Sequence, residues 1–194
     1  MDGLHPQEFI DSLSVEKNRE KVFMAGEGAG ASGSFFFFSY DNRFIIKTIG
    51  AQEKNILLNM LDDYIDHIQK TGNRSLLARI YGVFTIKTNI FAPMEVIVMQ
   101  NTVQTQSPNS EKLTFDLKGS TIHRYTHVKE QDFINQSRVL KDLNFMEINK
   151  AMNYTLLQIH SSTKSTLQSI LDLDSTFLKN HYLMDYSLLL VVES

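Results

Sequence analysis

Residues 26–50 read GEGAGASGSFFFFSYDNRFIIKTIG, and three features follow one another in this segment. Glycines and serines come first, four consecutive phenylalanines follow, and Lys47 later interrupts an apolar run. The polar residues 40–43 separate two apolar segments, which is the pattern of a β-hairpin. The second strand would carry Lys47 back under the glycine-rich loop.

A glycine-rich loop can turn several backbone N–H groups toward one anion, and phosphate is a common ligand of such loops. Lys47 would pair with the same charge, and Phe35 to Phe38 would anchor the loop in the core. The alternative is purely structural, because glycine-rich turns between strands are common and a lysine on an edge strand is usually solvated. The candidate phosphate-binding residues are Gly28, Gly30, Ser32, Gly33 and Ser34.

The next segment, AQEKNILLNMLDDYIDHIQK over residues 51–70, repeats apolar residues at helical spacing with polar residues between them. This pattern predicts one long amphipathic helix that ends near residues 71–73. Glu53 lies at its start, six residues after Lys47. In protein kinases a strand lysine pairs with a helix glutamate in this order along the chain, so Glu53 is the predicted partner of Lys47.

The remaining segments predict further strands and helices. A short helix beginning near Pro6 opens the chain. The order of the elements predicts an α+β fold with an antiparallel sheet first, and this sheet is expected to continue through the third of the later strands. The later strands are predicted at residues 78–87, 95–100, 112–118 and 186–192, with a helix over about residues 167–178.

The composition is that of a soluble protein with a large core. Of the 194 residues, 42% are hydrophobic and none is cysteine, which excludes disulfides and thiolate metal sites. The N-terminal residues lack the pattern of a signal peptide, so a cytoplasmic location is expected. The net charge of -3 argues against nucleic acid as a partner, although a local basic face is compatible with it.

Three motifs in order resemble the phosphatidylinositol phosphate kinases, and most of all the phosphatidylinositol-4-phosphate 5-kinases. They are GASGSFFFFSYDNRFIIKTI at residues 30–49, FDLKGST at residues 115–121 and MDYSLLL at residues 184–190. YGVF, VIVMQN and LKDLNF also match between them. The resemblance implies the kinase fold that this family shares with SAICAR synthetase. It also implies an ATP-dependent enzyme that phosphorylates an inositol-ring hydroxyl of a phosphatidylinositol phosphate.

The resemblance also implies how the chain is organised. Residues 1–194 would form a single catalytic core that is incomplete at its C-terminus. About residues 20–125 would be the N-lobe, with the sheet and the long helix, and about residues 139–194 the start of the C-lobe. Residues 126–138 would be the loop between them, and they offer little to bury, so disorder is an open alternative there.

On the nucleotide side, the resemblance implies that Lys47 holds ATP phosphates and that Glu53 positions its ammonium group. The strand VIVMQN would be the hinge, where backbone groups near Val98 and Met99 bind the adenine edge. The side chains of these two residues are expected to be core or pocket wall.

On the lipid side, the segment DLKGSTIHR surrounds a glycine with charges and hydroxyl groups, which suits an inositol phosphate. A bland alternative is an exposed turn with solvated charges. The resemblance makes Lys118 and Arg124 candidates for contact with lipid phosphate and Asp116 a local organiser of them.

Asp185 is the candidate catalytic carboxylate. Phosphoryl transfer needs a carboxylate near the attacking hydroxyl and a metal near the phosphates, and Asp185 comes directly before an apolar strand, where a sheet end would hold it. The same residue would be a Mg²⁺ ligand. The alternative is a carboxylate that caps a turn.

The sequence departs from the family pattern in two places. It ends nine residues after Asp185, before the second metal-binding aspartate and the activation loop of these kinases, and Asn144 stands where relatives often carry aspartate. Two hypotheses therefore stay open: a phosphoinositide kinase, or a non-catalytic module that binds nucleotide, phosphoinositide or a partner kinase. We expect weak or no turnover by this chain alone, and the sequence leaves open which inositol position would be phosphorylated.

Membrane contact is expected to be peripheral, at the inner face, through a surface with Lys118, Arg124 and Lys129. Each basic residue near an anionic surface contributes only about 1 kcal/mol, so a net-negative chain needs such a cluster or a partner. A homodimer is one assembly that the sequence leaves open.

Overall fold

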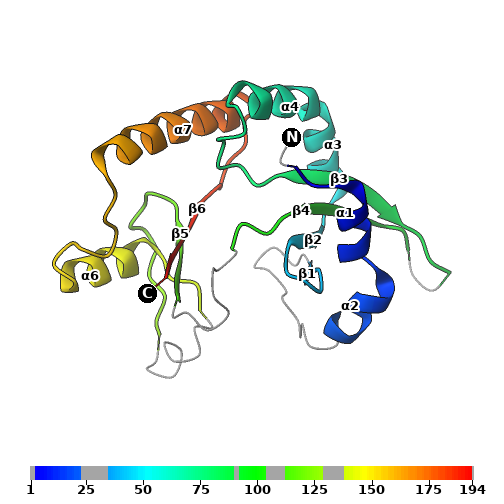
Figure 1. Ribbon diagram of the computed structural model, residues 1–194, viewed down its shortest axis with the longest axis horizontal. Helices are drawn as coiled ribbons and strands as arrows, with labels where there is room; N and C mark the ends of the chain where they lie inside the picture. Colours follow the sequence, from blue (N-terminus) through cyan, green and yellow to red (C-terminus); the bar gives the residue numbers. More distant parts are fainter. Residues whose placement is uncertain (1–2, 23–34, 90–91, 104–111, 129–137, 194) are drawn as a thin grey trace. The chain divides into compact units, whose positions relative to one another are not determined.

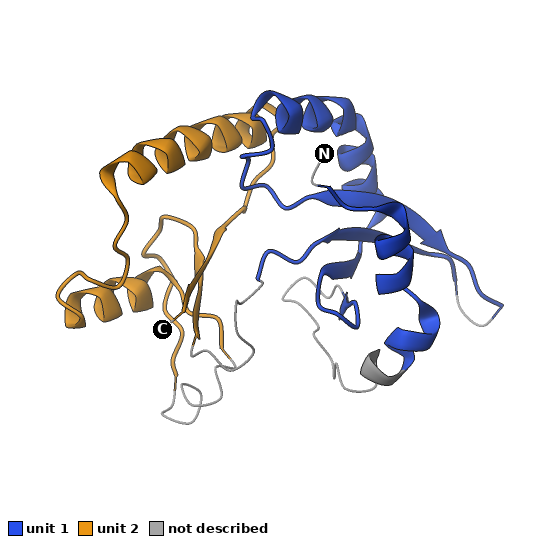
Figure 2. Cartoon of the chain, in the orientation of Figure 1, with its two compact units in different colours: residues 1–104 blue, residues 105–194 orange. Residues whose placement is uncertain are grey.

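The computed structural model describes residues 3–22, 35–89, 92–103, 112–128 and 138–193, with side chains described in the first range only as far as residue 19 (Figure 1). The chain divides into two compact units, residues 1–104 and residues 105–194 (Figure 2). The predicted loops at residues 105–110 and about 126–138 fall wholly or largely outside the described residues.

The first unit is built on a four-stranded antiparallel sheet with strand order β1-β2-β4-β3. The hairpin and the two following strands that the sequence predicts are confirmed. The strands are β1 (Phe36–Phe38), β2 (Phe44–Thr48), β3 (Ile80–Ile86) and β4 (Met94–Gln100). Phe44 and the middle of β4 supply buried core residues.

The hairpin turn is built by hydrogen bonds around Asp41. Its Oδ1 accepts hydrogen bonds from the hydroxyls of Ser39 and Ser12, each at 2.6 Å, and Asn42 takes a positive φ of 59°. Ser12 ends α1 (Pro6–Ser12), the helix predicted at Pro6, so the turn also fixes that helix. A second helix, α2 (Val15–Val22), follows and was not predicted.

The predicted long helix over residues 51–70 is two helices, so the prediction of one continuous helix is wrong. α3 (Ala51–Asn59) ends at Met60, and α4 (Leu61–Lys70) begins directly after it. Leu57, Met60 and Tyr64 are all buried. Because this apolar spacing runs unbroken through the junction, periodicity alone did not reveal the break.

The second unit contains a separate two-stranded antiparallel sheet of β5 (Lys112–Leu117) and β6 (Leu188–Glu193). The prediction that β5 continues the first sheet is therefore wrong, because hydrophobic pattern identifies a strand but not its partner. The predicted last strand and the helix before it, α7 (Ser161–Asn180), are confirmed, and α7 is longer than expected. The same unit contains a helix that was not predicted, α6 (Asp142–Ala151).

The core of the second unit forms where β5 meets α6. Phe115 of β5 is fully buried with Leu140 and Leu156, and its ring lies edge-on to Phe145 of α6, with the ring centroids 5.3 Å apart. Leu140 also bridges β5, with Asp116 N–H donating to the Leu140 carbonyl at 2.8 Å. This packing fixes the segments on both sides of residues 118–124.

No helix within the described parts of the chain combines the length and the apolar character needed to cross a membrane.

Candidate active site

Lys47 occupies the middle of the first sheet, on β2, where its backbone pairs with Phe36 on one side and Ile97 on the other. Its ammonium nitrogen lies 3.4 Å from Oε1 of Glu53 and 5.8 Å from the centroid of the Phe36 ring. The structure therefore brings together the lysine and glutamate that the sequence paired.

Glu53 has a second contact that the sequence did not predict. Its Oε2 accepts a hydrogen bond at 2.8 Å from the N–H of Gly50, the N-cap residue of α3, which is the half of a capping box that a glycine allows. The Gly50 hydrogen bond, and after it the charge of Lys47, lowers the pKa of Glu53 from its ordinary value. Glu53 is thus fixed by the helix terminus and ionised beside Lys47.

The glycine-rich loop, with Gly28, Gly30, Ser32, Gly33 and Ser34, lies outside the described residues. The phenylalanines after it are described. Phe35 and Phe38 are 55% and 44% exposed, so the expectation that all four anchor the loop in the core is wrong for these two. Phe35 precedes β1 and Phe38 is its last residue, so both exposed rings lie at the ends of an edge strand, which has a neighbouring strand on one side only.

Val98 and Met99 lie on β4, between β2 and β3. Val98 is buried, as expected for a core side chain. The backbone pairing of this strand continues through Gln100 and Asn101, whose N–H groups donate to the carbonyls of Arg79 and Arg43 at 2.7 and 2.9 Å. Because these backbone groups are already paired within the protein, we expect the groups that bind the adenine edge to follow Asn101. The assignment of adenine binding to the region of Val98 and Met99 stays a prediction.

In the second unit, Arg124 lies between two carboxylates. Its Nε donates to Oδ2 of Asp142 at 2.8 Å, and its Nη2 donates to the Asp116 carbonyl and lies 3.3 Å from Asp116 Oδ1. The Arg124 side chain is only 12% exposed. The hydrogen bond to Asp142 raises the pKa of Arg124. The charge of the Arg124 guanidinium group is therefore balanced by two carboxylates of the protein. The buried Oδ1 of Asp116 takes part in this ion pair but accepts no hydrogen bond.

Lys118 and Asp185 form an ion pair, in which the Lys118 ammonium group donates to Oδ1 of Asp185. Asp185 takes a positive φ of 62°, and its side chain is 84% exposed. The Lys118 hydrogen bond, with its charge, lowers the pKa of Asp185. Two predicted residues from distant motifs, one expected to bind substrate and one to catalyse, are thus in direct contact.

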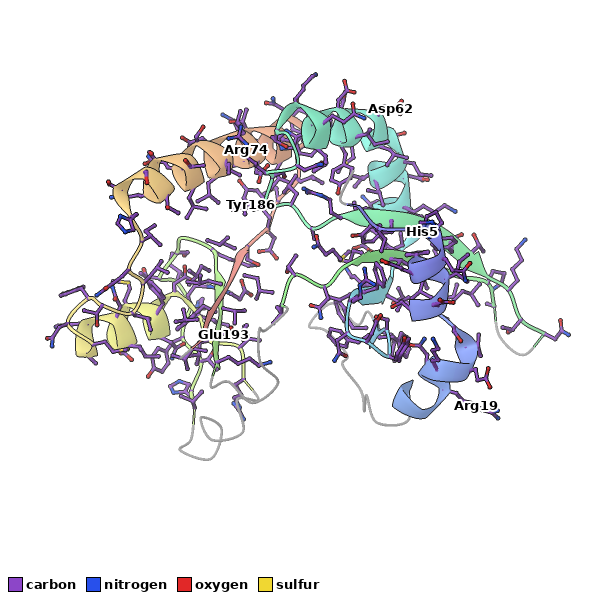
Figure 3. All side chains as sticks on the ribbon, in the orientation of Figure 1. His5, Arg19, Asp62, Arg74, Tyr186 and Glu193 are labelled. Carbon is purple, nitrogen blue, oxygen red and sulfur yellow. The ribbon has the colours of Figure 1, made fainter. Side chains whose placement is uncertain are left out.

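Asp185 precedes β6 on the loop that leaves α7. Figure 3 labels the next residue, Tyr186, at one end of this strand and Glu193 at the other. A shallow surface depression around the carboxylate is lined by Lys179, Tyr182, Leu183, Met184, Asp185 and Tyr186. The carboxylate is therefore open to a ligand.

Two buried polar residues of α6, Asp142 and Asn144, belong to this site, although no role was predicted for either of them. Asp142 accepts hydrogen bonds from the N–H groups of Lys118 and Gly119, in addition to Arg124. The side-chain amide of Asn144 accepts a hydrogen bond from the Thr126 N–H and donates one to the Thr126 carbonyl. Both residues lie in the motif LKDLNF, which contributed to the resemblance but does not by itself reveal these contacts.

Among the residues that the structure describes, no three histidine, aspartate or glutamate side chains gather closely enough to hold a metal ion. Asp185 offers the carboxylate oxygens that Mg²⁺ prefers, and Mg²⁺ often takes only one or two carboxylates together with substrate phosphates. The carboxylate of Asp185 therefore fits a Mg²⁺ ion whose other ligands come from substrate phosphates.

Residues 18–194 match the sequence profile of the Phosphatidylinositol-4-phosphate 5-Kinase family. The chain belongs to this family. The resemblance inferred from the three motifs is therefore confirmed, and the family's α+β kinase fold agrees with the helices and antiparallel sheets of the structure.

Individual members of the phosphatidylinositol-4-phosphate 5-kinase family are also similar to the chain. It is 37% identical over 163 residues to phosphatidylinositol 4-phosphate 5-kinase 9 of Arabidopsis thaliana, covering 84% of this chain and 18% of that protein. It is 33% identical over 190 residues to the type-1 beta enzyme of Gallus gallus, covering 97% of this chain and 32% of the relative. The chain thus spans about a third or less of these relatives.

Proposed function

We propose that this chain carries the ATP and phosphoinositide sites of a lipid kinase, which transfers the γ-phosphate of ATP to an inositol-ring hydroxyl of a phosphatidylinositol phosphate. The observation that carries the proposal is the ion pair between Lys118 and Asp185. It places a cation suited to a substrate phosphate beside a carboxylate suited to the attacking hydroxyl.

On the nucleotide side, Lys47 would hold the ATP phosphates under the glycine-rich loop of Gly28 to Ser34. The support is that Glu53 keeps the Lys47 ammonium group near the β1–β2 hairpin. A cation fixed before the ligand arrives stabilises the developing phosphoryl charge without reorganisation. Adenine would bind at the end of β4, near Val98 and Met99 and the backbone that follows them.

On the lipid side, Lys118 would contact the substrate phosphate, with Asp116 and Arg124 holding the turn that presents it. The support is that both Asp116 and Arg124 are engaged by protein groups, whereas the partner of Lys118 is an exposed carboxylate. An arriving phosphate would share the Lys118 ammonium group with Asp185. The Asp185 carboxylate would then accept the proton of the attacking hydroxyl.

Asp185 would also hold Mg²⁺. When bound, this ion neutralises negative charge on the phosphates. Membrane contact would be peripheral, on the cytoplasmic side, where phosphoinositide substrate is presented.

Transfer of labelled phosphate from ATP to vesicles with phosphatidylinositol 4-phosphate tests the proposal. Lys47→Ala and Asp185→Asn should each abolish incorporation that the unaltered chain gives. Lys87→Ala and Asp172→Asn are matched controls, because they make the same changes at exposed positions outside the site. Incorporation that survives both site substitutions would overturn the assignment.

The same samples distinguish the kinase from a non-catalytic module. A module would show no incorporation, yet ATP would still raise its melting temperature, and Lys47→Ala would remove that rise. The proposed lipid site is tested separately by binding of soluble inositol 1,4-bisphosphate. Lys118→Ala should weaken this binding whether the chain is a kinase or a non-catalytic module.

A further inference from the structure

The Asp142 carboxylate contacts three residues of the proposed lipid site: Lys118, Gly119 and Arg124. Its Oδ1 accepts hydrogen bonds from the backbone N–H groups of Lys118 at 3.1 Å and Gly119 at 2.8 Å. Its Oδ2 accepts from Nε of Arg124 at 2.8 Å. One carboxylate thus holds the beginning and the end of the segment from Lys118 to Arg124.

The turn at Lys118 and Gly119 is shaped to receive this carboxylate. Gly119 takes a positive φ of 68°, and the successive N–H groups of Lys118 and Gly119 converge on one oxygen of Asp142. Such convergent N–H groups form an anion-binding nest. The nest is filled here by Asp142, which is buried. The backbone of the turn is therefore satisfied by protein, and only the Lys118 side chain extends from it toward Asp185.

Asp142 is itself held firmly. It is the first residue of α6, two residues after Leu140, whose backbone is hydrogen-bonded to β5, and the Leu143 N–H donates to the Arg124 carbonyl at 3.0 Å. Phe145 in the same helix packs on buried Phe115. The position of the carboxylate is thus fixed by the core of the unit.

We propose that Asp142 is a positioning residue of the phosphoryl-transfer site, which sets the backbone of Lys118 so that its ammonium group meets Asp185. Its role in turnover rests on the proposed function, but its role in forming the ion pair does not. Asparagine cannot replace it, because an NH₂ group would stand where one of the two carboxylate oxygens accepts hydrogen bonds. The donors of that NH₂ group would then face the N–H donors of the site.

The first test reads the ion pair itself. The ¹H–¹⁵N resonance of the Lys118 ammonium group, assigned by its loss in Lys118→Arg, should shift in Asp185→Asn. Asp142→Asn should reproduce this shift, and Asp172→Asn, the same change at an exposed position of α7, should not. An unchanged Lys118 resonance in folded Asp142→Asn would overturn the proposal.

A second pair of variants covers the case in which Asp142→Asn fails to fold. A Cβ at Gly119 would meet no atom within 4 Å, so substitutions there act through the backbone conformation. Gly119→Val opposes the positive φ, whereas Gly119→Asn tolerates it better. The valine variant should shift the Lys118 resonance as Asp185→Asn does, and the asparagine variant should not. Equal resonances in both would contradict the proposal.

Kinetics then separate this inference from the proposed function. Asp142→Asn should lower kcat by about 100-fold, the size expected when catalytic groups move by about 1 Å, while KM for ATP stays unchanged. A shifted Lys118 resonance with no transfer by the unaltered chain would favour the non-catalytic module and retain the positioning role. An unshifted resonance with normal transfer in Asp142→Asn would overturn the positioning role and retain the kinase function.

Discussion

Asn144 is a buried residue in the first turn of α6, and both ends of its amide group are used. Oδ1 accepts hydrogen bonds from the N–H groups of Thr126 and Lys141 at 2.8 and 3.1 Å, and Nδ2 donates to the Thr126 carbonyl at 3.0 Å. An aspartate could accept the first two hydrogen bonds but could not donate the third. The asparagine amide therefore uses both its acceptor and its donor in this chain.

Asn144→Asp should lower the free energy of unfolding by about 1–3 kcal/mol at neutral pH, because a buried carboxylate oxygen would face a carbonyl oxygen. Urea denaturation measures the change. Asn153→Asp adds the same charge at an exposed position of the same unit and should leave stability nearly unchanged. Equal stability of the unaltered chain and Asn144→Asp would show that the donated hydrogen bond is unimportant.

Asp41 in the hairpin turn gives stability a defined pH dependence. Burial raises its pKa, but hydrogen bonds from Ser12, Ser39 and the Arg43 N–H outweigh burial and leave the pKa below its ordinary value of 3.8. A lowered pKa in the folded state means that the stabilisation is complete above the unfolded-state pKa and is lost as the pH falls through the folded-state value.

We therefore expect the free energy of unfolding to fall as the pH drops below about 4, and to fall less steeply in Asp41→Asn. Urea titrations at several acidic pH values measure both slopes. Asp11→Asn, an exposed residue of α1, is the control and should keep the steep slope. Parallel slopes for Asp41→Asn and the unaltered chain would exclude this contribution.

At the scale of an element, α3 links its own start to Lys47 through a single side chain. Glu53 caps the helix through Gly50 and pairs with Lys47. Glutamine keeps an oxygen for the Gly50 N–H but removes the charge, and alanine removes both. The two substitutions therefore separate the helix cap from the ion pair.

Glu53→Gln should cost less than about 1 kcal/mol of stability, because exposed ion pairs contribute little. Glu53→Ala should cost about 1 kcal/mol more, the typical contribution of a helix cap. Chemical denaturation measures both. If Glu53 also positions Lys47 for ATP, the rise in melting temperature with ATP should shrink in both variants. An undiminished rise in Glu53→Gln would separate nucleotide binding from the ion pair.

The elements also show what sequence pattern can and cannot predict. The hairpin, β3, β4, α7 and β6 follow from local periodicity and turn residues, and so they were predicted. Periodicity does not encode contacts between residues far apart in the chain, such as the pairing of β5 with β6 and the contacts of Asp142. It also does not show the break at Met60, because the apolar spacing continues through it. Lys118 and Asp185 were each chosen as site residues, but their pairing came only from the structure.

At the scale of the whole molecule, charge limits how strongly the chain alone can bind a membrane. Its net charge is -3, and the cation of Arg124 is already balanced by Asp116 and Asp142. Lys118 is paired as well, but its partner is exposed. Weak, salt-sensitive binding to anionic vesicles is therefore expected.

Lys118→Ala should weaken binding to phosphatidylinositol 4-phosphate vesicles by about fivefold, equivalent to the roughly 1 kcal/mol that one basic residue contributes at an anionic surface. Co-sedimentation at low and moderate salt measures the change. Lys164→Ala, an exposed lysine of α7, is the matched control and should have a smaller effect. Equal losses in both variants would indicate a diffuse electrostatic attraction without a phosphate site.

Lys118 is held at both ends, by Asp142 at its backbone and by Asp185 at its ammonium group. A lysine side chain that is free to rotate loses up to about 2 kcal/mol of conformational entropy when it becomes ordered. Here most of that ordering occurs during folding, before any ligand arrives. A phosphate that shares this ammonium group with Asp185 would therefore meet a side chain that has already lost its freedom, and binding would carry a smaller entropic penalty.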